Sequence, residues 1–310
     1  MTNIYVSGSL AYDRIMSFPG RFADHILPDK IHMLNVSFTI SGIVERTGGT
    51  AGNIAYALSL LGEKPTILAT LGQDGQRYLD WLKSNGIPSH GIKTIPDEFT
   101  ASAYITTDQN DNQITGFNPG AMKHASAYDL GDTVARSSIA VIAPGNLDDM
   151  VTYSSEFLRR GVDFIFDPGQ SLPLWEGKRL AAALTGAKVL ISNDYEFEMI
   201  QRKTGLDTAG LLRQVRAIIT TKAEHGSVIT TSKGETAVPA YALGPKAVDP
   251  TGAGDAYRSG LVKGLIDGKD LVHSARMGTV CASFAVEVQG TQEYRFTQAE
   301  FGARLRELPG

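Results

Sequence analysis

The chain has 310 residues, with 29 Lys and Arg against 33 Asp and Glu, a formal net charge of −4 and one cysteine. This length suits one large domain or two modest ones with an ample core, and the weak negative charge argues against nucleic acid and anionic membranes as partners. The single thiol, Cys281, excludes an internal disulfide and a multi-thiolate metal site, and the six histidines have no metal-ligand spacing.

The N-terminal sequence predicts a cytoplasmic protein that begins in a sheet. Residues 1–8 lack the basic and apolar regions of a secretion signal, and no run reaches the roughly 18 apolar residues of a membrane span. Residues 4–6 form a short apolar strand, and Asp13 follows soon after it. Because ligands bind at the carboxyl ends of strands in open α/β sheets, Asp13 is a candidate acceptor for sugar hydroxyls. An Asx turn is the structural alternative.

Extended segments outside this sheet predict a small β lid. Residues from about 31 to 45 are rich in β-branched and aromatic side chains, and residues 101–107 and 113–117 pair around a turn at 110–112. We place the lid at about 14–46 and 98–118. Met33, Phe38 and Phe117 are candidates to line an apolar slot for a ligand, with packing inside the lid as the alternative.

A glycine-rich turn, Gly48-Gly49-Thr50-Ala51-Gly52-Asn53, opens a helix predicted over 50–61. Gly48 and Gly49 allow a ligand to approach the backbone closely. Asn53 lies in the first helical turn, where its amide is placed either to bind a hydroxyl-rich ligand or to cap the helix. The evident basic residue beside this turn is Arg46.

Strands and helices alternate through the middle of the chain. Strands are predicted near 66–70, 138–143, 163–167, 188–192, 217–221 and 227–231, and helices near 78–85, 148–160, 176–184, 194–203 and 208–216. This alternation is typical of a mostly parallel sheet with helices on both faces. Since no repeat or linker interrupts it, we expect one α/β domain over residues 1–310 with the lid inserted.

Two polar motifs follow strands of the predicted sheet. Asn193 and Glu196 share the first turn of the helix over 194–203, and their oxygens suit a hydrated Mg²⁺ ion. A capping arrangement between the two side chains is the structural alternative. The loop from Thr221 to Gly226 joins two apolar strands, and a nucleotide is able to lie over its small residues.

A second glycine-rich segment, Asp249-Pro250-Thr251-Gly252-Ala253-Gly254-Asp255, joins a turn to a helix predicted over 252–266. The free amides at a helix start suit an oxyanion or a transferring phosphoryl group. The helix dipole keeps Asp255 ionised, so this carboxylate is able to take the proton of an attacking hydroxyl. A simple helix-terminal charge is the alternative.

The C-terminal region is predicted to hold two long helices, 252–266 and 270–287. Gly252, Ala256, Gly260 and Gly264 recur every four residues, so one stripe of the first helix is nearly bare and lets another element pack closely. The chain has no G-x-x-x-x-G-K-[ST] motif, and no G-x-G-x-x-G follows the first strand. A Walker-type ATPase and a standard dinucleotide dehydrogenase therefore lose support.

In this order, the motifs resemble the ribokinase or phosphofructokinase B family of carbohydrate and nucleoside kinases. The resemblance covers nearly the whole chain, and residues 48–53 and 249–255 match the two signature regions. It implies a ribokinase-like α/β fold, ATP as phosphate donor and Mg²⁺ as cofactor. Many members also hold a monovalent cation such as K⁺, which would lie here between Asp249 and the Gly290 loop.

The resemblance also implies residue roles. Asp255 matches the catalytic base, and the amides of Gly252, Ala253 and Gly254 match the anion hole. The remaining matches are Asp13, Gly49 and Asn53 for sugar hydroxyls, Asn193 and Glu196 for magnesium and phosphate (Glu196 through water), and Thr221 and Gly226 for the nucleotide. The chain departs from the family at Ala223, where a glycine is usual, and at Tyr257, where Phe is usual.

Lid segments such as Leu34-Asn35-Val36-Ser37-Phe38 look like those of bacterial members called adenosine kinases. The resemblance thus implies ATP-dependent phosphorylation of a nucleoside 5′-hydroxyl, first of all adenosine to AMP in purine salvage. One alternative is a kinase for ribose, fructose or a sugar phosphate. Another is a non-catalytic nucleotide or nucleoside sensor, although the intact Gly-Ala-Gly-Asp element argues against it. Exposed lid edges leave a monomer and a lid-mediated homodimer open.

Overall fold

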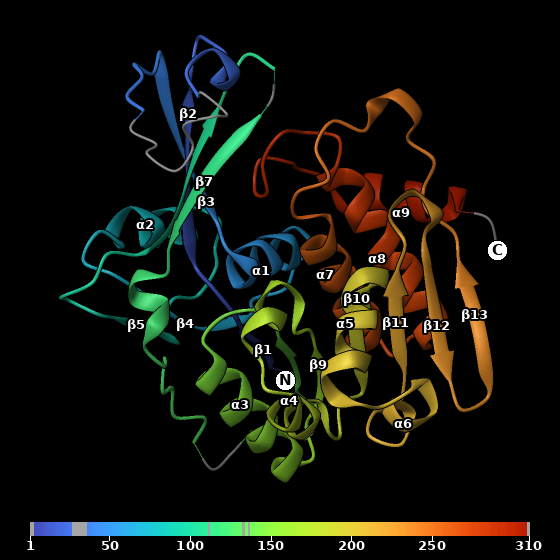
Figure 1. Ribbon diagram of the computed structural model, residues 1–310. Coiled ribbons are helices and arrows are strands. Elements are labelled where there is room, and N and C mark those ends of the chain that lie inside the picture. The colour runs from blue at the N-terminus through green and yellow to red at the C-terminus, as the bar shows by residue number, and fades with distance from the viewer. Residues whose placement is uncertain (1–2, 27–35, 111, 132–133, 136, 309–310) are drawn as a thin grey trace.

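The computed structural model describes residues 3–26, 36–110, 112–131, 134–135 and 137–308. Met33 and the first part of the extended segment predicted from residue 31 lie outside the described residues. A helix-covered body carries a separate small sheet that projects from it (Figure 1). None of the helices in the described part of the chain is long and apolar enough to cross a membrane.

In the described residues, nine strands form the central sheet in the order β13-β12-β11-β10-β9-β8-β1-β4-β5. Their bounds are β1 (Ile4–Ser7), β4 (Thr66–Leu71), β5 (Ile92–Thr94), β8 (Ile139–Ile142), β9 (Asp163–Phe166), β10 (Val189–Asn193), β11 (Ile218–Thr221), β12 (Ser227–Thr231) and β13 (Gly234–Val238). Among these strands, β12 alone runs in the direction opposite to the others, since it is antiparallel to both β11 and β13. The mostly parallel sheet predicted from the sequence is confirmed.

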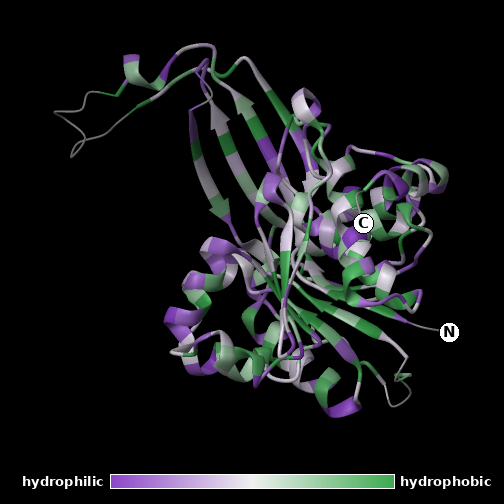
Figure 2. Cartoon of the chain, turned by 90° about the vertical axis from the view of Figure 1, so that its right-hand side faces the viewer, coloured by the Kyte–Doolittle hydropathy of each residue, from purple (hydrophilic) through white to green (hydrophobic). Residues whose placement is uncertain are grey.

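Helices cover both faces of this sheet and enclose two apolar cores. One core takes residues from α1 (Thr50–Leu60), α2 (Gln76–Ser84), α7 (Ala253–Ile266), α8 (Leu271–Ala285) and α9 (Gln298–Glu307); the other takes them from α3 (Leu147–Arg160), α4 (Gly177–Leu184), α5 (Asp194–Thr204) and α6 (Thr208–Leu212). Strand residues alternate between the cores, as Val6 and Tyr5 do, because successive side chains point to opposite faces. Figure 2 shows hydrophobic residues concentrated along the central strands.

Four elements of the body differ from the sequence prediction. Helix α6 ends at Leu212 rather than near 216, because the chain turns to join the sheet, where the Arg216 amide donates to the Ala187 carbonyl at 3.1 Å. The strands β5 and β13 and the helix α9 were not predicted. β13 is polar and largely exposed, so it lacks an apolar signature, whereas α9 begins with a capping box between Thr297 and Glu300 that the sequence displays.

The predicted lid is a second sheet, which we call the lid throughout. Within the described residues its order is β3-β2-β6-β7, made of β2 (Ala11–Ser17), β3 (Gly42–Gly48), β6 (Ala101–Thr107) and β7 (Gln113–Asn118). β2 was not predicted as a strand. Its presence corrects the placement of Asp13, which lies inside this lid strand opposite Arg46 and not at the carboxyl end of a central strand.

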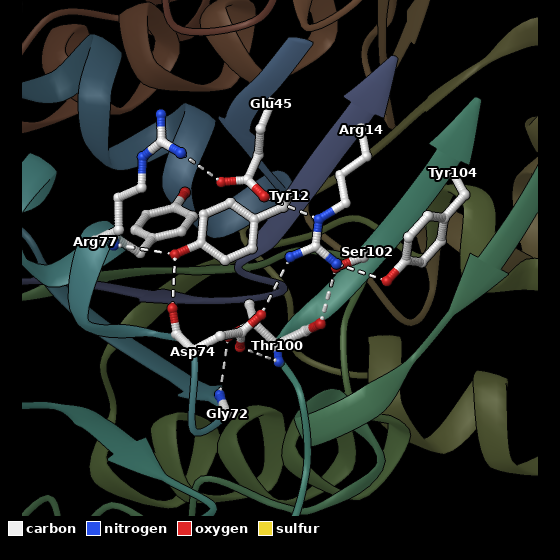
Figure 3. Close-up of polar contacts among 10 residues, drawn as sticks. Tyr12, Arg14, Glu45, Gly72, Asp74, Arg77, Thr100, Ser102 and Tyr104 are labelled. Carbon is white, nitrogen blue, oxygen red and sulfur yellow. Dashed lines mark hydrogen bonds and ion pairs between the residues drawn. The ribbon is translucent and has the colours of Figure 1, made fainter. Parts of the chain in front are cut away.

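A polar cluster fixes the lid to the body on one face of the lid (Figure 3). Arg14 of β2 donates to Glu45 of β3 at 2.8 Å, to Asp74 at 3.2 Å and to the Tyr104 hydroxyl at 2.6 Å. Asp74 precedes α2 and also accepts the Thr100 amide at 2.7 Å. Since neighbouring strand residues point to opposite faces, this cluster lies on the face opposite Asp13.

Candidate active site

Asp255 lies in the first turn of α7, directly behind the helix N-terminus. The N-cap residue Gly252 has a φ of 79°, a left-handed conformation that glycine adopts without strain. The Asp255 side chain is only 13% exposed. Burial raises the pKa of Asp255, whereas the charge of Arg258 and a hydrogen bond from Asn53 lower it. The carboxylate is therefore recessed, and on balance its pKa lies above the usual range of an Asp side chain, because burial outweighs the two opposing contributions.

A chain of hydrogen bonds joins Asp255 to the first glycine-rich turn. Asn53 donates from Nδ2 to Asp255 Oδ2 at 2.8 Å, and its Oδ1 accepts from Gln292 Nε2 at 2.8 Å. Gln292 also donates to the Tyr78 hydroxyl at 3.2 Å, which donates to the Gly48 carbonyl at 2.7 Å. Gln292 thus fixes which end of the Asn53 amide faces Asp255.

The carboxylate of Asp13 lies over the first glycine-rich turn. A Cβ at Gly48 would come within 2.7 Å of Asp13 Oδ2, so the absence of a side chain there makes room for the carboxylate. Burial raises the pKa of Asp13 and the charge of Arg46 lowers it. Thr291 lies 3.6 Å from the Cβ position of Gly48 and 3.0 Å from that of Gly252. The two signature regions therefore converge on one loop, and Gly49 begins α1 beside them.

The lid face that carries Asp13 is apolar beyond it. Ile15 of β2 lies opposite Val44 of β3 and Ile105 of β6. Phe117 of β7 lies on the same face, opposite the β6 residue that pairs with Asp13. Val44 and Phe117 are more than half exposed. A contact between Phe117 and a ligand stays a prediction, and the other three residues were missed because β2 and its register were not recognised.

Phe38 lies outside the four strands of the lid. Its ring centroid is 4.6 Å from that of Phe18 and 5.6 Å from that of Phe22. These distances place Phe38 in an aromatic cluster, which is the packing alternative that the sequence left open. A contact between Phe38 and a ligand stays a prediction.

Asn193 and Glu196 form a reciprocal capping box at the start of α5. Asn193 Oδ1 accepts the Glu196 amide at 2.7 Å, and Glu196 Oε2 accepts the Asn193 amide at 2.9 Å. The structural alternative is thus realised. Thr221 ends β11 directly beside Asn193 in the sheet register, so the loop from Thr221 to Gly226 and the Asn193 motif lie together. Both are at the carboxyl edge of the sheet.

Asp249 connects its own turn to the Gly290 loop, and a monovalent cation between them stays a prediction. Its carboxylate accepts the Thr251 amide at 2.9 Å and the Gly290 amide at 3.0 Å. Although burial opposes it, these hydrogen bonds lower the pKa of Asp249. Among the described residues, no group of three or more His, Cys, Asp or Glu side chains is arranged to hold a metal ion.

Sequence reasoning missed two charged residues beside Asp255. Asp167 directly follows β9 and forms an ion pair with Arg258 of α7, with a distance of 2.5 Å between Oδ2 and Nη2. The available signal was an Asp-Pro-Gly sequence at the carboxyl end of a buried strand, the edge where ligands bind. Gln292 was missed as well, because its contacts join residues far apart in the chain.

A recessed carboxylate in the first turn of α7, the glycine-rich turn before α1 and the polar loops after β10 and β11 gather as the ligand site of an open α/β fold does. The sequence of the chain matches the model of the pfkB family carbohydrate kinases over residues 11–297. The chain belongs to this family, and it is therefore an enzyme that transfers a phosphoryl group to a hydroxyl group. The family and fold expected from the motifs are confirmed.

Relatives match along almost the whole chain. A nucleoside kinase of Methanothermobacter thermautotrophicus is 31% identical over 289 residues, which cover 91% of this chain and 93% of that protein. The ligand-free structure of Burkholderia thailandensis nucleoside kinase matches with a TM-score of 0.87 and 40% identity over 97% of this chain and 99% of that one. The structure of the same kinase in complex with ADP-inosine matches with a TM-score of 0.82 and 39% identity, and the match covers 98% of this chain and 95% of that one. The structure of the Methanocaldococcus jannaschii nucleoside kinase, an archaeal member of the ribokinase family, matches with a TM-score of 0.88 and 30% sequence identity, and the match covers 99% of both chains.

Proposed function

We propose that the chain transfers the γ-phosphoryl group of ATP to the 5′-hydroxyl of a nucleoside, with adenosine as the first candidate and AMP as its product. One observation carries the proposal: the lid face that bears Asp13 continues into the exposed apolar side chains of Val44 and Phe117. A carboxylate binds ribose hydroxyls, and an apolar face accommodates a nucleobase. The similarity to nucleoside kinases, one of them solved with inosine, supports the same substrate class.

Asp255 is the catalytic base of this reaction. It accepts the proton of the 5′-hydroxyl as the oxygen attacks phosphorus, while Asn53 holds the carboxylate in place. The amides of Gly252, Ala253 and Gly254 at the start of α7 stabilise the charge that develops on the transferring group. Closure of the lid over the substrate excludes the water that would otherwise hydrolyse ATP.

The cation and nucleotide sites belong to the same proposal. Glu196 would hold Mg²⁺ through water by Oε1, since Oε2 accepts the Asn193 amide, and carboxylate oxygens are suitable donors for this ion. Mg²⁺ supplies charge neutralisation on the ATP phosphates when bound. Thr221 and Gly226 would hold the nucleotide beside Asn193, and Asp249 would face a monovalent cation such as K⁺. We place the reaction in the cytoplasm, in purine salvage.

A substrate panel tests this function. ATP consumption is measured with adenosine, inosine, cytidine, ribose and fructose 6-phosphate, and 5′-deoxyadenosine serves as a control that retains the base but lacks the acceptor hydroxyl. We expect the highest kcat/KM for adenosine and no turnover of the control. A preference for ribose or fructose 6-phosphate would identify a sugar kinase instead. Nucleoside binding without turnover of any substrate would identify a sensor.

A further inference from the structure

Arg258 lies one helical turn beyond Asp255, and its side chain reaches back to the start of α7. Nη1 is 4.0 Å from Asp255 Oδ1, and Nη2 forms the ion pair with Asp167. A Cβ on Gly254 would lie 2.6 Å from Nη1. The glycine of the second signature therefore leaves the space that the guanidinium occupies, beside the proposed anion hole.

A contribution to the stability of the fold does not explain the ion pair between Arg258 and Asp167. Asp167 is 1% exposed and Arg258 is buried. Arg258 Nε has no hydrogen-bond partner in the described part of the chain, whereas the Asp167 carboxylate also has the backbone amide of Gly169 beside it. Burying two charges with incomplete hydrogen bonding costs more than packing apolar side chains of the same size. A pair retained at this cost, next to the reacting groups, indicates a role in the reaction.

Arg258 supplies the positive charge that acts on Asp255. The other titratable groups around the carboxylate are Asp167 in the loop after β9, Glu196 of α5, which acts on Asp167, and Tyr294 in the C-terminal loop. The first two are acidic. Burial raises the pKa of Tyr294 well above its usual range, so this hydroxyl stays neutral. Asn53 contributes a hydrogen bond from α1 but no charge.

We propose that Arg258, anchored by Asp167, is the positioning residue that keeps Asp255 ionised and therefore able to accept the proton of the substrate hydroxyl. The proposal rests on the function proposed above. A recessed site favours a neutral carboxyl group, and the phosphates of ATP add negative charge nearby. A guanidinium does not lose its proton in any accessible pH range, so it opposes both effects throughout.

The test is the pH dependence of kcat for two variants of the full-length enzyme. The base must be ionised, so activity is lost as the pH falls through the pKa of Asp255. Arg258→Met removes the positive charge and is expected to move this acid limb upward by about one to three pH units. Asp167→Asn loosens the anchor of the guanidinium, so it is expected to move the acid limb upward as well, by less than Arg258→Met does. The KM for the nucleoside should stay near the wild-type value in both.

Two further variants control for changes in side-chain size and in helix charge. Arg258→Lys keeps the charge, and its acid limb should stay close to that of the wild type. Lys263→Met changes another ion-paired residue of α7, which contacts Glu63 and Asp267 away from the site. Its pH profile should equal the wild-type profile.

The possible outcomes separate the two proposals. A wild-type enzyme that phosphorylates no nucleoside overturns the proposed function and this inference with it. An active wild type combined with an unshifted acid limb in Arg258→Met, or with an equal loss of rate at every pH, overturns the inference alone. If circular dichroism shows that Arg258→Met does not fold, Asp167→Asn decides: a raised acid limb supports the inference, and an unshifted or lowered acid limb overturns it.

Discussion

Ala223 has a φ of 48°, in the left-handed region, at the position where the family motif has glycine. An L-residue with a Cβ loses roughly 1–2 kcal/mol in this conformation, whereas glycine adopts it freely at an entropic cost of about 0.5–1 kcal/mol. We therefore expect Ala223→Gly to raise the free energy of unfolding by up to about 1 kcal/mol. Urea denaturation followed by circular dichroism measures the difference.

The matched control for this substitution is Ala182→Gly in the exposed face of α4. In an ordinary helical conformation the same change should lower the free energy of unfolding by about 1 kcal/mol. An equal decrease in the free energy of unfolding for both variants would contradict the strain assigned to Ala223.

The second departure from the family motif is compensated by a hydrogen bond. The hydroxyl of Tyr257 lies 2.9 Å from the Ser227 hydroxyl, and both residues are buried. A buried hydroxyl without a partner would be costly, so the tyrosine is tolerated where phenylalanine is usual. The sequence shows the substitution but not its hydrogen-bond partner, because Ser227 lies on another element, the strand β12.

At the scale of elements, the bare stripe predicted on the first C-terminal helix is confirmed as the contact between α7 and α8. A Cβ on Gly260 would lie 2.3 Å from the Met277 carbonyl oxygen, and one on Gly264 would lie 2.6 Å from Ser274 Cα. These neighbours are backbone atoms, which cannot move aside as a side-chain tip can. The position of α7, and with it that of Asp255, depends on this close packing.

Gly260→Ala is therefore expected to lower the free energy of unfolding by about 1–3 kcal/mol, as overpacked substitutions do. It should also reduce kcat, because α7 carries the proposed base and anion hole. The control is Gly302→Ala in α9, whose Cβ would meet only Arg306 Nη1 at 3.5 Å. The free energy of unfolding of this variant should rise by about 0.4–1 kcal/mol. Equal stability of the two variants in urea would contradict the account of the stripe.

At the scale of the whole molecule, the arrangement of the sheets could be predicted from the sequence, but the way the lid meets the body could not. The regular alternation of apolar strands and helices marks the body. β2 was missed because Asp13 and Arg14 place two charged residues in mid-strand, and only the tertiary fold supplies their partners: Arg46 opposite the first and Asp74 bonded to the second.

The functional site was predictable from the sequence only where it depends on local features. Both glycine signatures and Asp255 follow from local sequence, since glycine turns and helix starts are local features. Asp167, Arg258 and Gln292 were missed because what matters about them is a contact formed across the fold. Sequence spacing alone does not show that the segment after β9 ends beside α7.

The sequence left a monomer and a lid-mediated homodimer open, and exposed side chains of the lid favour the homodimer. Ile43 is 60% exposed and Ile114 is 47% exposed on the lid face opposite Asp13. We expect a homodimer that pairs these faces, because exposed apolar side chains beside open strand edges favour association. Sedimentation velocity at micromolar concentration should show a dimer that Ile43→Lys shifts to monomer. Leu174→Lys, at an exposed site on the body, should leave the dimer intact. Sedimentation of the wild type as monomer alone would rule the pairing out.

The most direct test of the central claim is the steady-state turnover of Asp255→Asn with the nucleoside that the panel selects. An amide of the same shape cannot accept the proton, so kcat should fall by about 10²–10⁴-fold while the KM for the nucleoside stays near the wild-type value. Phosphorus NMR of the wild-type product should show a nucleoside 5′-monophosphate. Turnover of Asp255→Asn at the wild-type rate would contradict the assignment of Asp255 as the base.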